Sequence, residues 1–385
     1  MSDSPTLFGT YDTQYDGVKI AFEEGFTSGR EVGAAVSVWR EGRCVVDLWS
    51  GHTDRKKSLP WQEDTLCCFF SVSKALTATC LLQAVDQGLI NLDAEVTEYW
   101  PEFGAKSAYK TTVRHLLTHQ AGLPGLHEPV TRETLYDWNS MCKRLAAETP
   151  WWPPGTEHGY HARSFGFLVG EVLRRATGHN VGAWLAKNIS SKLDLDVYIG
   201  LSEVDQKRCV AMIPARLRPG EVNNLTPAMR KMIRDFIDKS TATGAAFQNP
   251  TLGVGYMNTA EFRAAQLPAM NGHGTARDVA KFMQNIPHIL SANLITQAVA
   301  TASYGEDRVL KSTSRFGLGY MLHDEEAPVG WPGCFGHAGA GGSLAFADTH
   351  KKIGFAFVMN QMQAGVVTGG TTATACAAAL KLCVD

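Results

Sequence analysis

The order of strand and helix patterns along the chain constrains its fold more than any single motif does. Two short runs typical of strands, 32–39 and 44–49, lie near the N-terminus and are joined by a hairpin turn. Strand patterns return near the C-terminus, at 316–322, 343–348 and 353–359. The residues between are mainly helical in pattern. The compact solution is one sheet that is assembled from both ends of the chain and has the middle inserted as a helical unit.

We therefore predict an α/β (α+β) fold, in which helices flank an antiparallel sheet and a mainly helical domain is inserted. Residues 1–75 and 270–385 form the predicted discontinuous sheet domain, and 76–269 the helical one. The stretch 219–256 is polar and hard to classify, so we interpret it as a long loop or a lid. With 385 residues, 44% of them hydrophobic, the chain is long enough to bury a large core.

Apolar residues at helical spacing predict several helices. Predicted helices are 12–29, 75–85, 112–119, 165–173, a helix that follows the N-cap Thr275, and 371–382.

Charge and cysteine usage narrow the classes of partner and compartment. The formal net charge is −2 and no basic run is present, which argues against nucleic acid or a membrane surface as the main partner. No apolar stretch approaches the roughly 20 residues of a membrane span. The N-terminus lacks the basic and apolar regions of a secretory signal. The nine cysteines are odd in number and include adjacent Cys67 and Cys68, which favours free thiols and predicts a cytoplasmic protein.

Patterns for metal ions and cofactors are weak. His115 and His119 stand four residues apart, but the residue after His115 is leucine rather than the glutamate of a His-Glu-x-x-His zinc site. The glycine-rich run 339–342 has no Lys-Ser/Thr after it, as a phosphate loop requires. We therefore predict no metal and no cofactor. A Gly-x-Ser-x-Gly elbow is also missing, which argues against an α/β-hydrolase fold.

Ser71 and Lys74 are the strongest chemical signal. The apolar run 66–70 leads into them and an apolar helix leads out, so a buried segment turns into a helix at Ser71. Positions i and i+3 share one face of a helix, which places the Lys74 amine beside the Ser71 hydroxyl. A neighbouring base turns serine into an effective nucleophile, and an apolar setting lowers the pKa of a lysine. The pair predicts a serine acyl-transfer enzyme. The alternative is that Ser71 only caps the N-terminus of the helix and that Lys74 reaches solvent.

The Ser-x-x-Lys spacing alone proves little, because the chain contains it twice more. Ser107 and Lys110 lie in a polar connection, and Ser140 and Lys143 lie on a helix crowded with charge. Only the Ser71 match has its lysine entering an apolar helix.

Three motifs in order resemble the serine β-lactamase and penicillin-binding protein superfamily. The first is Ser71-Val72-Ser73-Lys74, and the second is the stretch 154–162, with Tyr160 as its tyrosine. The third is 335–342, which contains His337-Ala338-Gly339. The match spans most of the chain and most resembles the family VIII carboxylesterases.

The resemblance implies roles for residues that local pattern does not assign. Tyr160 joins Lys74 as a coupled acid–base pair, and the backbone N–H groups of Ser71 and Ala340 hold the oxyanion. His337 is a candidate residue of the acyl or alcohol pocket. Gly339 is expected to let the strand backbone approach the substrate, against the alternative of an ordinary β-bulge glycine. Trp152 and His161 are further candidate contacts. For His337, His161 and Trp152, packing in the core is the alternative interpretation.

Two departures from the superfamily pattern bear on the substrate. Ala162 stands where Tyr-x-Asn has its asparagine, and His337 stands where Lys-Thr-Gly has its lysine. That lysine supplies a fixed positive charge for a substrate carboxylate, whereas histidine is largely neutral at pH 7. We therefore predict a serine carboxylesterase that acts on small neutral esters.

Three other functions share these motifs. An acyltransferase would use the same acyl-enzyme with an alcohol in place of water. A β-lactam or D-amino-acid peptide hydrolase is disfavoured by His337 and Ala162. A non-catalytic scaffold is disfavoured by the retention of Ser71, Lys74 and Tyr160 together. The expected partner is a small-molecule ester, and the sequence leaves open whether the chain forms a homo-oligomer.

Overall fold

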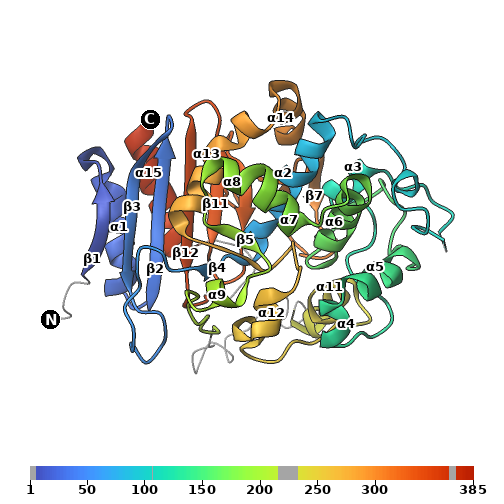
Figure 1. The fold of residues 1–385 in the computed structure, drawn as a ribbon, viewed down its shortest axis with the longest axis horizontal. Coiled ribbons are helices and arrows are strands. Elements are labelled where there is room, and N and C mark those ends of the chain that lie inside the picture. Colours follow the sequence, from blue (N-terminus) through green and yellow to red (C-terminus); the bar gives the residue numbers. More distant parts are fainter. Residues whose placement is uncertain (1–5, 106, 216–232, 364–369) are drawn as a thin grey trace.

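The computed structural model describes residues 6–105, 107–215, 233–363 and 370–385, and its centre is a nine-stranded antiparallel sheet (Figure 1). The strands are β1 (Leu7–Tyr11), β2 (Gly33–Arg40), β3 (Arg43–Gly51), β7 (Ser303–Glu306), β8 (Thr313–Phe316), β9 (Met321–Leu322), β10 (Phe335–Ala338), β11 (Leu344–Asp348) and β12 (Ile353–Met359). Their order in the sheet is β1-β3-β2-β12-β11-β10-β9-β8-β7.

The two ends of the chain meet in the middle of this sheet. Strand β2 pairs antiparallel with β12, with Val36 opposite Phe357. The predicted fold class, an antiparallel sheet assembled from both ends and flanked by helices, is confirmed. The division into domains at 75 and 270 stays a prediction. Of the predicted loop or lid at 219–256, residues 219–232 lie outside the described residues, and the remainder contains the helix α11 (Ala242–Gln248).

Helices cover both faces of the sheet (Figure 1). On one face, Phe357 of β12 contacts Phe22 of α1 (Asp16–Thr27), with ring centroids 6.2 Å apart, and α15 (Thr372–Val384) packs beside α1. On the other face lies α13 (Ala276–Ile289). A Cβ atom on Gly354 would stand 2.1 Å from the Ala280 carbonyl oxygen, so only glycine lets α13 approach this closely. Residues 354 and 357 are an odd number apart, which puts them on opposite faces of the strand.

The region beside the sheet is mainly helical. Its helices are α2 (Ser73–Asp86), α3 (Val113–Leu117), α4 (Arg132–Tyr136), α5 (Trp138–Ala146), α6 (Ser164–Thr177), α7 (Val181–Leu185), α8 (Ser191–Leu193), α9 (Glu203–Gln206), α11 (Ala242–Gln248), α12 (Ala260–Ala264) and α14 (Ala292–Val299). A small second sheet has the order β4 (Cys67–Cys68), β6 (Gly272–Gly274), β5 (Val197–Ile199).

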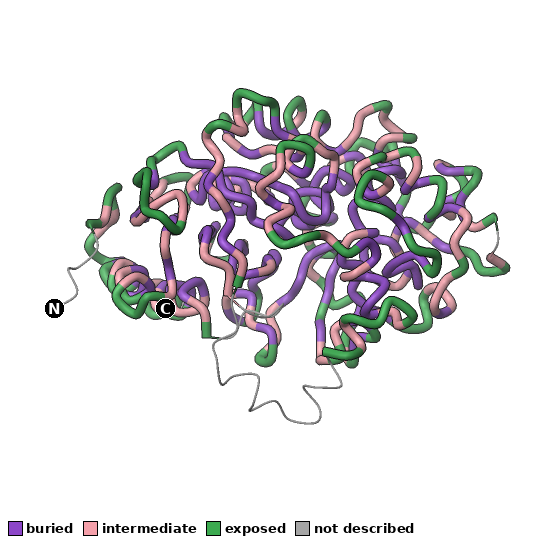
Figure 2. The backbone as a smooth tube through the Cα atoms, turned by 90° about the horizontal axis from the view of Figure 1, so that it is seen from below, coloured by how far each residue is buried: buried purple, intermediate pink, exposed green. Residues whose placement is uncertain are grey.

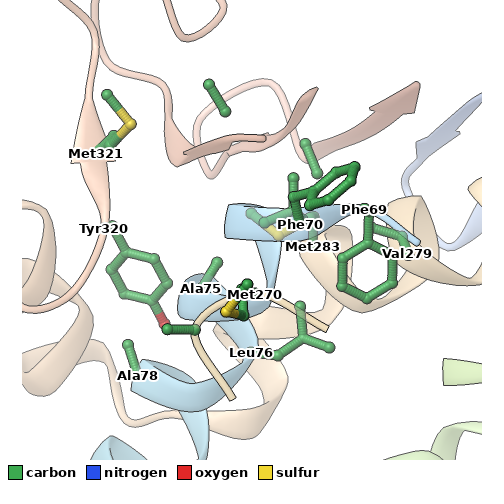
Figure 3. Close-up of a cluster of buried hydrophobic side chains, with 14 of the residues drawn as sticks. Phe69, Phe70, Ala75, Leu76, Ala78, Met270, Val279, Met283, Tyr320 and Met321 are labelled. Atoms are coloured by element: carbon green, nitrogen blue, oxygen red, sulfur yellow. The ribbon is translucent and has the colours of Figure 1, made fainter. Parts of the chain in front are cut away.

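Helix α2 lies in the centre of the molecule, where the chain is buried (Figure 2). Its apolar residues run all round the helix, which is typical of a helix enclosed on every side. Figure 3 shows Ala75, Leu76 and Ala78 of this helix, with Phe69 beside Val279 of α13. The hydroxyl groups of Thr77 and Thr79 donate to carbonyls one turn back, Ser73 O and Ala75 O, so burial leaves neither hydroxyl without a partner.

Most predicted elements are present, with one clear error. Thr275 caps α13, because its side chain accepts a hydrogen bond from the Asp278 N–H. The predicted strand 316–322 is wrong: β8 ends at Phe316, and β9 contains only Met321 and Leu322. Gly319 has a φ of +82°, a left-handed conformation that breaks the extended run. In the described part of the chain, no helix is both long enough and apolar enough to span a membrane.

Candidate active site

Ser71 lies on a tight turn between β4 and α2. Phe70 before it has a φ of +46°, which is unusual for a bulky residue and marks local strain. Ser73 holds this turn: its hydroxyl donates to the Phe70 carbonyl and accepts from the Gly272 N–H at 2.8 Å. Because β6 carries Gly272, the small sheet fixes the position of Ser71 from outside its own helix.

Lys74 is fully buried, and its amine lies beside the Ser71 hydroxyl. Lys74 Nζ is 3.2 Å from Ser71 Oγ, 2.8 Å from the Ala162 carbonyl oxygen and 3.0 Å from the Ala269 carbonyl oxygen. Removal from water disfavours the charged form, so burial places the pKa of the Lys74 amine well below its usual value. Among the described residues Lys74 has no carboxylate partner to reverse this effect.

Tyr160 lies against Lys74, with the amine 4.6 Å from the centre of the phenol ring. Its backbone is anchored by Asp307, which accepts a hydrogen bond from the Tyr160 N–H at 3.0 Å. Its ring stacks on Phe316 at 6.2 Å between centroids. Burial raises the pKa of the Tyr160 hydroxyl above its usual value, and a hydrogen bond with the Ser71 side chain offsets only part of that rise.

The three residues line or adjoin one cavity of about 250 Å³. Its lining residues are Phe70, Ser71, Tyr160, Ala162, Arg163, Phe236, Phe247, Gln248, Leu252, Tyr256, Met270, Leu310, Met321, His337, Ala338 and Ala340. The backbone N–H groups of Ser71 and Ala340 donate to no acceptor within the described residues. The cavity lining thus combines apolar side chains with Ser71 and Ala340, and the Lys74 amine lies beside the Ser71 hydroxyl.

His337 lines the cavity from β10, and the adjacent backbone holds its ring. Its Nδ1–H donates to the Ala338 carbonyl oxygen at 2.6 Å, whereas Nε2 is buried and has no partner in the described part of the chain. Burial, reinforced by the nearby Lys74 amine, lowers the pKa of the imidazole to about 3. His337 is therefore neutral at pH 7 and offers Nε2 as an acceptor.

The other three candidate substrate contacts do not line the cavity. His161 is fully buried; its Nε2 accepts from the Leu123 N–H and its Nδ1 donates to the Gly159 carbonyl, so both ring nitrogens serve the backbone. The Trp152 indole donates to the Glu157 carbonyl. A Cβ on Gly339 would stand 2.4 Å from the Phe69 carbonyl oxygen, so Gly339 lets β10 approach the Ser71 turn. In this structure the three residues therefore serve packing and backbone positioning, and their predicted role as substrate contacts stays a prediction.

His115 and His119, the pair considered as metal ligands, each use Nδ1 to accept a backbone hydrogen bond. His115 Nδ1 accepts from the Thr112 N–H, and His119 Nδ1 accepts from the His161 N–H. Within the described residues no group of three histidine, cysteine, aspartate or glutamate side chains could hold a metal ion.

Sequence reasoning missed three residues at the site. Asp307 carries no local signal, because it contacts Tyr160 from 147 positions away. Ser73 was visible inside the first motif but had no predicted role. Arg163 follows the second motif directly and lines the cavity, and its position three residues after Tyr160 was the available clue.

Comparison with known proteins agrees with this geometry. The family model described as beta-lactamase matches residues 18–379. The esterase/beta-lactamase LipL of Mycobacterium tuberculosis is 34% identical over 375 residues, which cover 94% of this chain and 84% of LipL. A solved family VIII carboxylesterase superposes with a TM-score of 0.87 at 34% identity, covering 98% of this chain and 100% of that one.

A penicillin-binding protein homologue from Caulobacter crescentus superposes with a TM-score of 0.86 at 32% identity, covering 98% of this chain and 100% of that one. The resemblance inferred from three motifs is thereby confirmed over nearly the whole chain. The chain belongs to the beta-lactamase family and is an enzyme, a serine hydrolase of β-lactamase-like fold with carboxylesterases among its relatives.

Proposed function

We propose that this enzyme is a serine carboxylesterase that forms an acyl-enzyme on Ser71. The observation that carries the proposal is the set of three atoms around Lys74 Nζ: two carbonyl oxygens, of Ala162 and Ala269, and the Ser71 hydroxyl. A neutral amine has two N–H donors and one lone pair. The carbonyls take the two donors, which directs the lone pair at Ser71 Oγ–H.

Burial supports the same protonation state. It lowers the pKa of Lys74 and raises the pKa of Tyr160, so the resting pair is a neutral amine and a neutral phenol. Lys74 is then the base that takes the Ser71 proton as Oγ attacks the ester carbonyl carbon. Tyr160, still protonated, is the acid that gives a proton to the leaving alcohol.

The remaining steps use the same groups. The N–H groups of Ser71 and Ala340 stabilise the oxyanion of the tetrahedral intermediate, a contribution worth about 10²–10³ in rate per donor. Expulsion of the alcohol leaves the acyl group on Ser71 Oγ. Water then attacks the acyl carbonyl carbon and gives one proton to the Tyr160 phenolate. As the bond from Ser71 Oγ to the acyl carbon breaks, Lys74 returns its proton to Oγ, and the acid leaves with Ser71, Lys74 and Tyr160 restored.

The cavity supports small esters as substrates. Its volume of about 250 Å³ and its phenylalanine, leucine and methionine lining suit a short apolar acyl or alcohol group. His337 is neutral and supplies no charge at the position where Lys-Thr-Gly enzymes have one.

The test is hydrolysis of 4-nitrophenyl acetate and butyrate by the wild type and by Ser71→Ala, with a chromogenic cephalosporin alongside. Ser107→Ala, from the surface copy of the same spacing, is the matched control. We expect Ser71→Ala to lose ester turnover, Ser107→Ala to keep it, and the cephalosporin to be hydrolysed far more slowly than the esters. Ester turnover that survives in Ser71→Ala would refute the nucleophile, and a preference for the cephalosporin would refute the esterase assignment.

Acyl transfer to an alcohol is the second candidate. A relative named acyltransferase mokF, from Monascus pilosus, is 29% identical over 159 residues, which cover 35% of this chain. Product analysis with a competing alcohol in the 4-nitrophenyl butyrate assay separates the two: an esterase yields mainly butyric acid, and a transferase yields mainly the new ester.

A further inference from the structure

Arg163 is a positive charge on the wall of the catalytic cavity. It directly follows Ala162, whose carbonyl accepts from Lys74, and precedes the first residue of α6. Its guanidinium spans the end of α11, where it donates to the Phe247 carbonyl and, at 2.6 Å, to the Pro250 carbonyl. The side chain therefore lies between the Tyr160 loop and the segment that carries the phenylalanine wall.

No negative charge in the described residues balances Arg163. It makes no ion pair there, whereas Arg208 pairs with Asp196 and Arg277 pairs with Asp47 and Glu63. Both of its hydrogen-bond acceptors are neutral carbonyls. Loss of hydration lowers its pKa, and the opposing influences come only from two tyrosines, Tyr136 and Tyr256.

A cation in this setting is costly unless an anion joins it. Charges removed from water are normally paired, because hydrogen bonds to neutral carbonyls replace only part of the lost hydration. A guanidinium has five N–H donors, and the two bonds to Phe247 and Pro250 leave three for a ligand. A planar carboxylate matches that fork with two parallel N–H···O bonds, and it is the anion that an ester of a dicarboxylic acid carries.

We propose that Arg163 binds a carboxylate on the substrate, so that the enzyme prefers esters carrying a second, ionised acid group. The inference rests on the proposed esterase function and names its substrate class. Arg163 takes the part that the third-motif lysine has in related enzymes, but from the segment just after Tyr160 rather than from β10. Such a substrate departs from the neutral esters predicted from the sequence: His337 is neutral, but Arg163 supplies a cation at another part of the cavity lining.

The test uses ester pairs that differ only in one charge. On the acyl side we compare mono-4-nitrophenyl adipate with its methyl ester. On the alcohol side we compare 4-acetoxybenzoate with methyl 4-acetoxybenzoate. For each pair the readout is the ratio of kcat/KM, carboxylate over methyl ester, in the wild type, Arg163→Gln and the control Arg308→Gln. Arg308 is a cation near the site that does not line the cavity and pairs with Glu157.

We expect the wild type to prefer the carboxylate in at least one pair by about 10- to 100-fold, the range of a charge-assisted hydrogen bond. In Arg163→Gln the ratio falls to about one, whatever happens to the absolute rates, and in Arg308→Gln it stays at the wild-type value. A purely structural Arg163 that only holds the 247–250 segment would lower both members of a pair equally. That result, or a wild-type ratio near one in both pairs, overturns the proposal.

Two further measurements keep the result decisive. If Arg163→Gln does not fold by circular dichroism, Arg163→Lys replaces it: we expect a ratio between one and the wild-type value, because the charge remains and the fork is lost. An unchanged ratio in Arg163→Lys would show that the fork is not the binding element. If Ser71→Ala loses 4-nitrophenyl butyrate turnover and the wild-type ratios are near one, the charge preference alone is refuted. If Ser71→Ala keeps that turnover, Ser71 is refuted as the nucleophile of the proposed function.

Discussion

The residues proposed to be catalytic and the apolar lining proposed to hold the substrate, which we call the catalytic end and the substrate end of the cavity, are built in opposite ways. At the catalytic end, Ser71, Lys74 and Tyr160 are held by hydrogen bonds from several elements, and Lys74 Nζ has three partners within 3.2 Å. At the substrate end, Phe236, Phe247 and other apolar side chains form the wall through ring contacts. Hydrogen bonds hold the side chains of the catalytic end in one geometry. Ring contacts at the substrate end set only the size and shape of the space for a substrate group.

This difference predicts that substitutions at the catalytic end abolish turnover and those at the wall redirect it. Polar groups at the first end are mutually dependent, because removal of one leaves others buried without partners. Apolar contacts at the second end are more independent, so their loss changes which ester fits rather than whether an ester reacts.

Lys74→Met gives the largest expected effect. It removes the base beside Ser71 and leaves the Ala162 and Ala269 carbonyls without their donor. We expect kcat for 4-nitrophenyl butyrate to fall by about 10⁴-fold or more. The control is Lys110→Met, from the surface Ser107-x-x-Lys110 copy, which should keep wild-type kcat. Equal activity in wild type and Lys74→Met would remove Lys74 from the mechanism.

Tyr160→Phe tests the acid of the pair with little change in packing. The ring contacts with Phe316 and His119 remain, so the free energy of unfolding should change by no more than about 1 kcal/mol. Loss of the proton donor should lower kcat by about 10²–10⁴-fold. A Tyr160→Phe enzyme with full kcat on 4-nitrophenyl butyrate would instead place the proton transfer on Lys74 alone.

At the catalytic end, Ser71 and Lys74 were predictable because they follow one another at helical spacing. Ser71 and Lys74 lie one turn apart, and the apolar sequence of α2 predicted that the Lys74 amine is buried. Tyr160 needed the resemblance, since nothing local links positions 71 and 160. Asp307 and Ser73 were missed as anchors, because their partners are set by tertiary contacts rather than by spacing.

The residues of the substrate end could largely not be predicted, because tertiary contacts rather than sequence spacing bring them together. Phe247 and Arg163 come together only through the Phe247 carbonyl, a backbone atom that no sequence pattern marks. The strands at the sheet centre were predicted well because both faces are buried, as in β12. The edge strands β1 and β7 were not predicted, because their exposed residues weaken the apolar pattern that marks a strand.

The pH dependence of stability tests whether Lys74 is neutral in the folded enzyme. Burial lowers its native pKa, whereas the unfolded chain keeps the proton up to about pH 10.4. Between those two values the unfolded state binds one proton more, so the free energy of unfolding rises with pH. Measured as wild type minus Lys74→Met, the rise should be about 1.4 kcal/mol per pH unit. Urea unfolding at several pH values from 7 to 9.5 gives this difference. A flat difference over that range would mean that Lys74 stays charged in the fold.

Phe247→Ala gives the smallest expected effect and concerns the wall alone. Phe247 stacks on Phe236 with ring centroids 5.1 Å apart, so its truncation widens the cavity. We expect the ratio of kcat/KM for 4-nitrophenyl octanoate over acetate to rise by about 10-fold. Phe8→Ala, at a side chain 45% exposed on β1, should leave the ratio unchanged. A ratio unmoved by Phe247→Ala would place the acyl group elsewhere.

The most direct test of this account is to find the acyl group on the enzyme. Wild-type protein is mixed with a molar excess of 4-nitrophenyl butyrate, quenched in acid within the first turnover, digested and mapped by mass spectrometry. The account predicts one butyryl group per chain, on Ser71, and none in Ser71→Ala. Butyryl on another residue, such as Cys68 or Ser107, or turnover without any acylated peptide in the wild type, would contradict it.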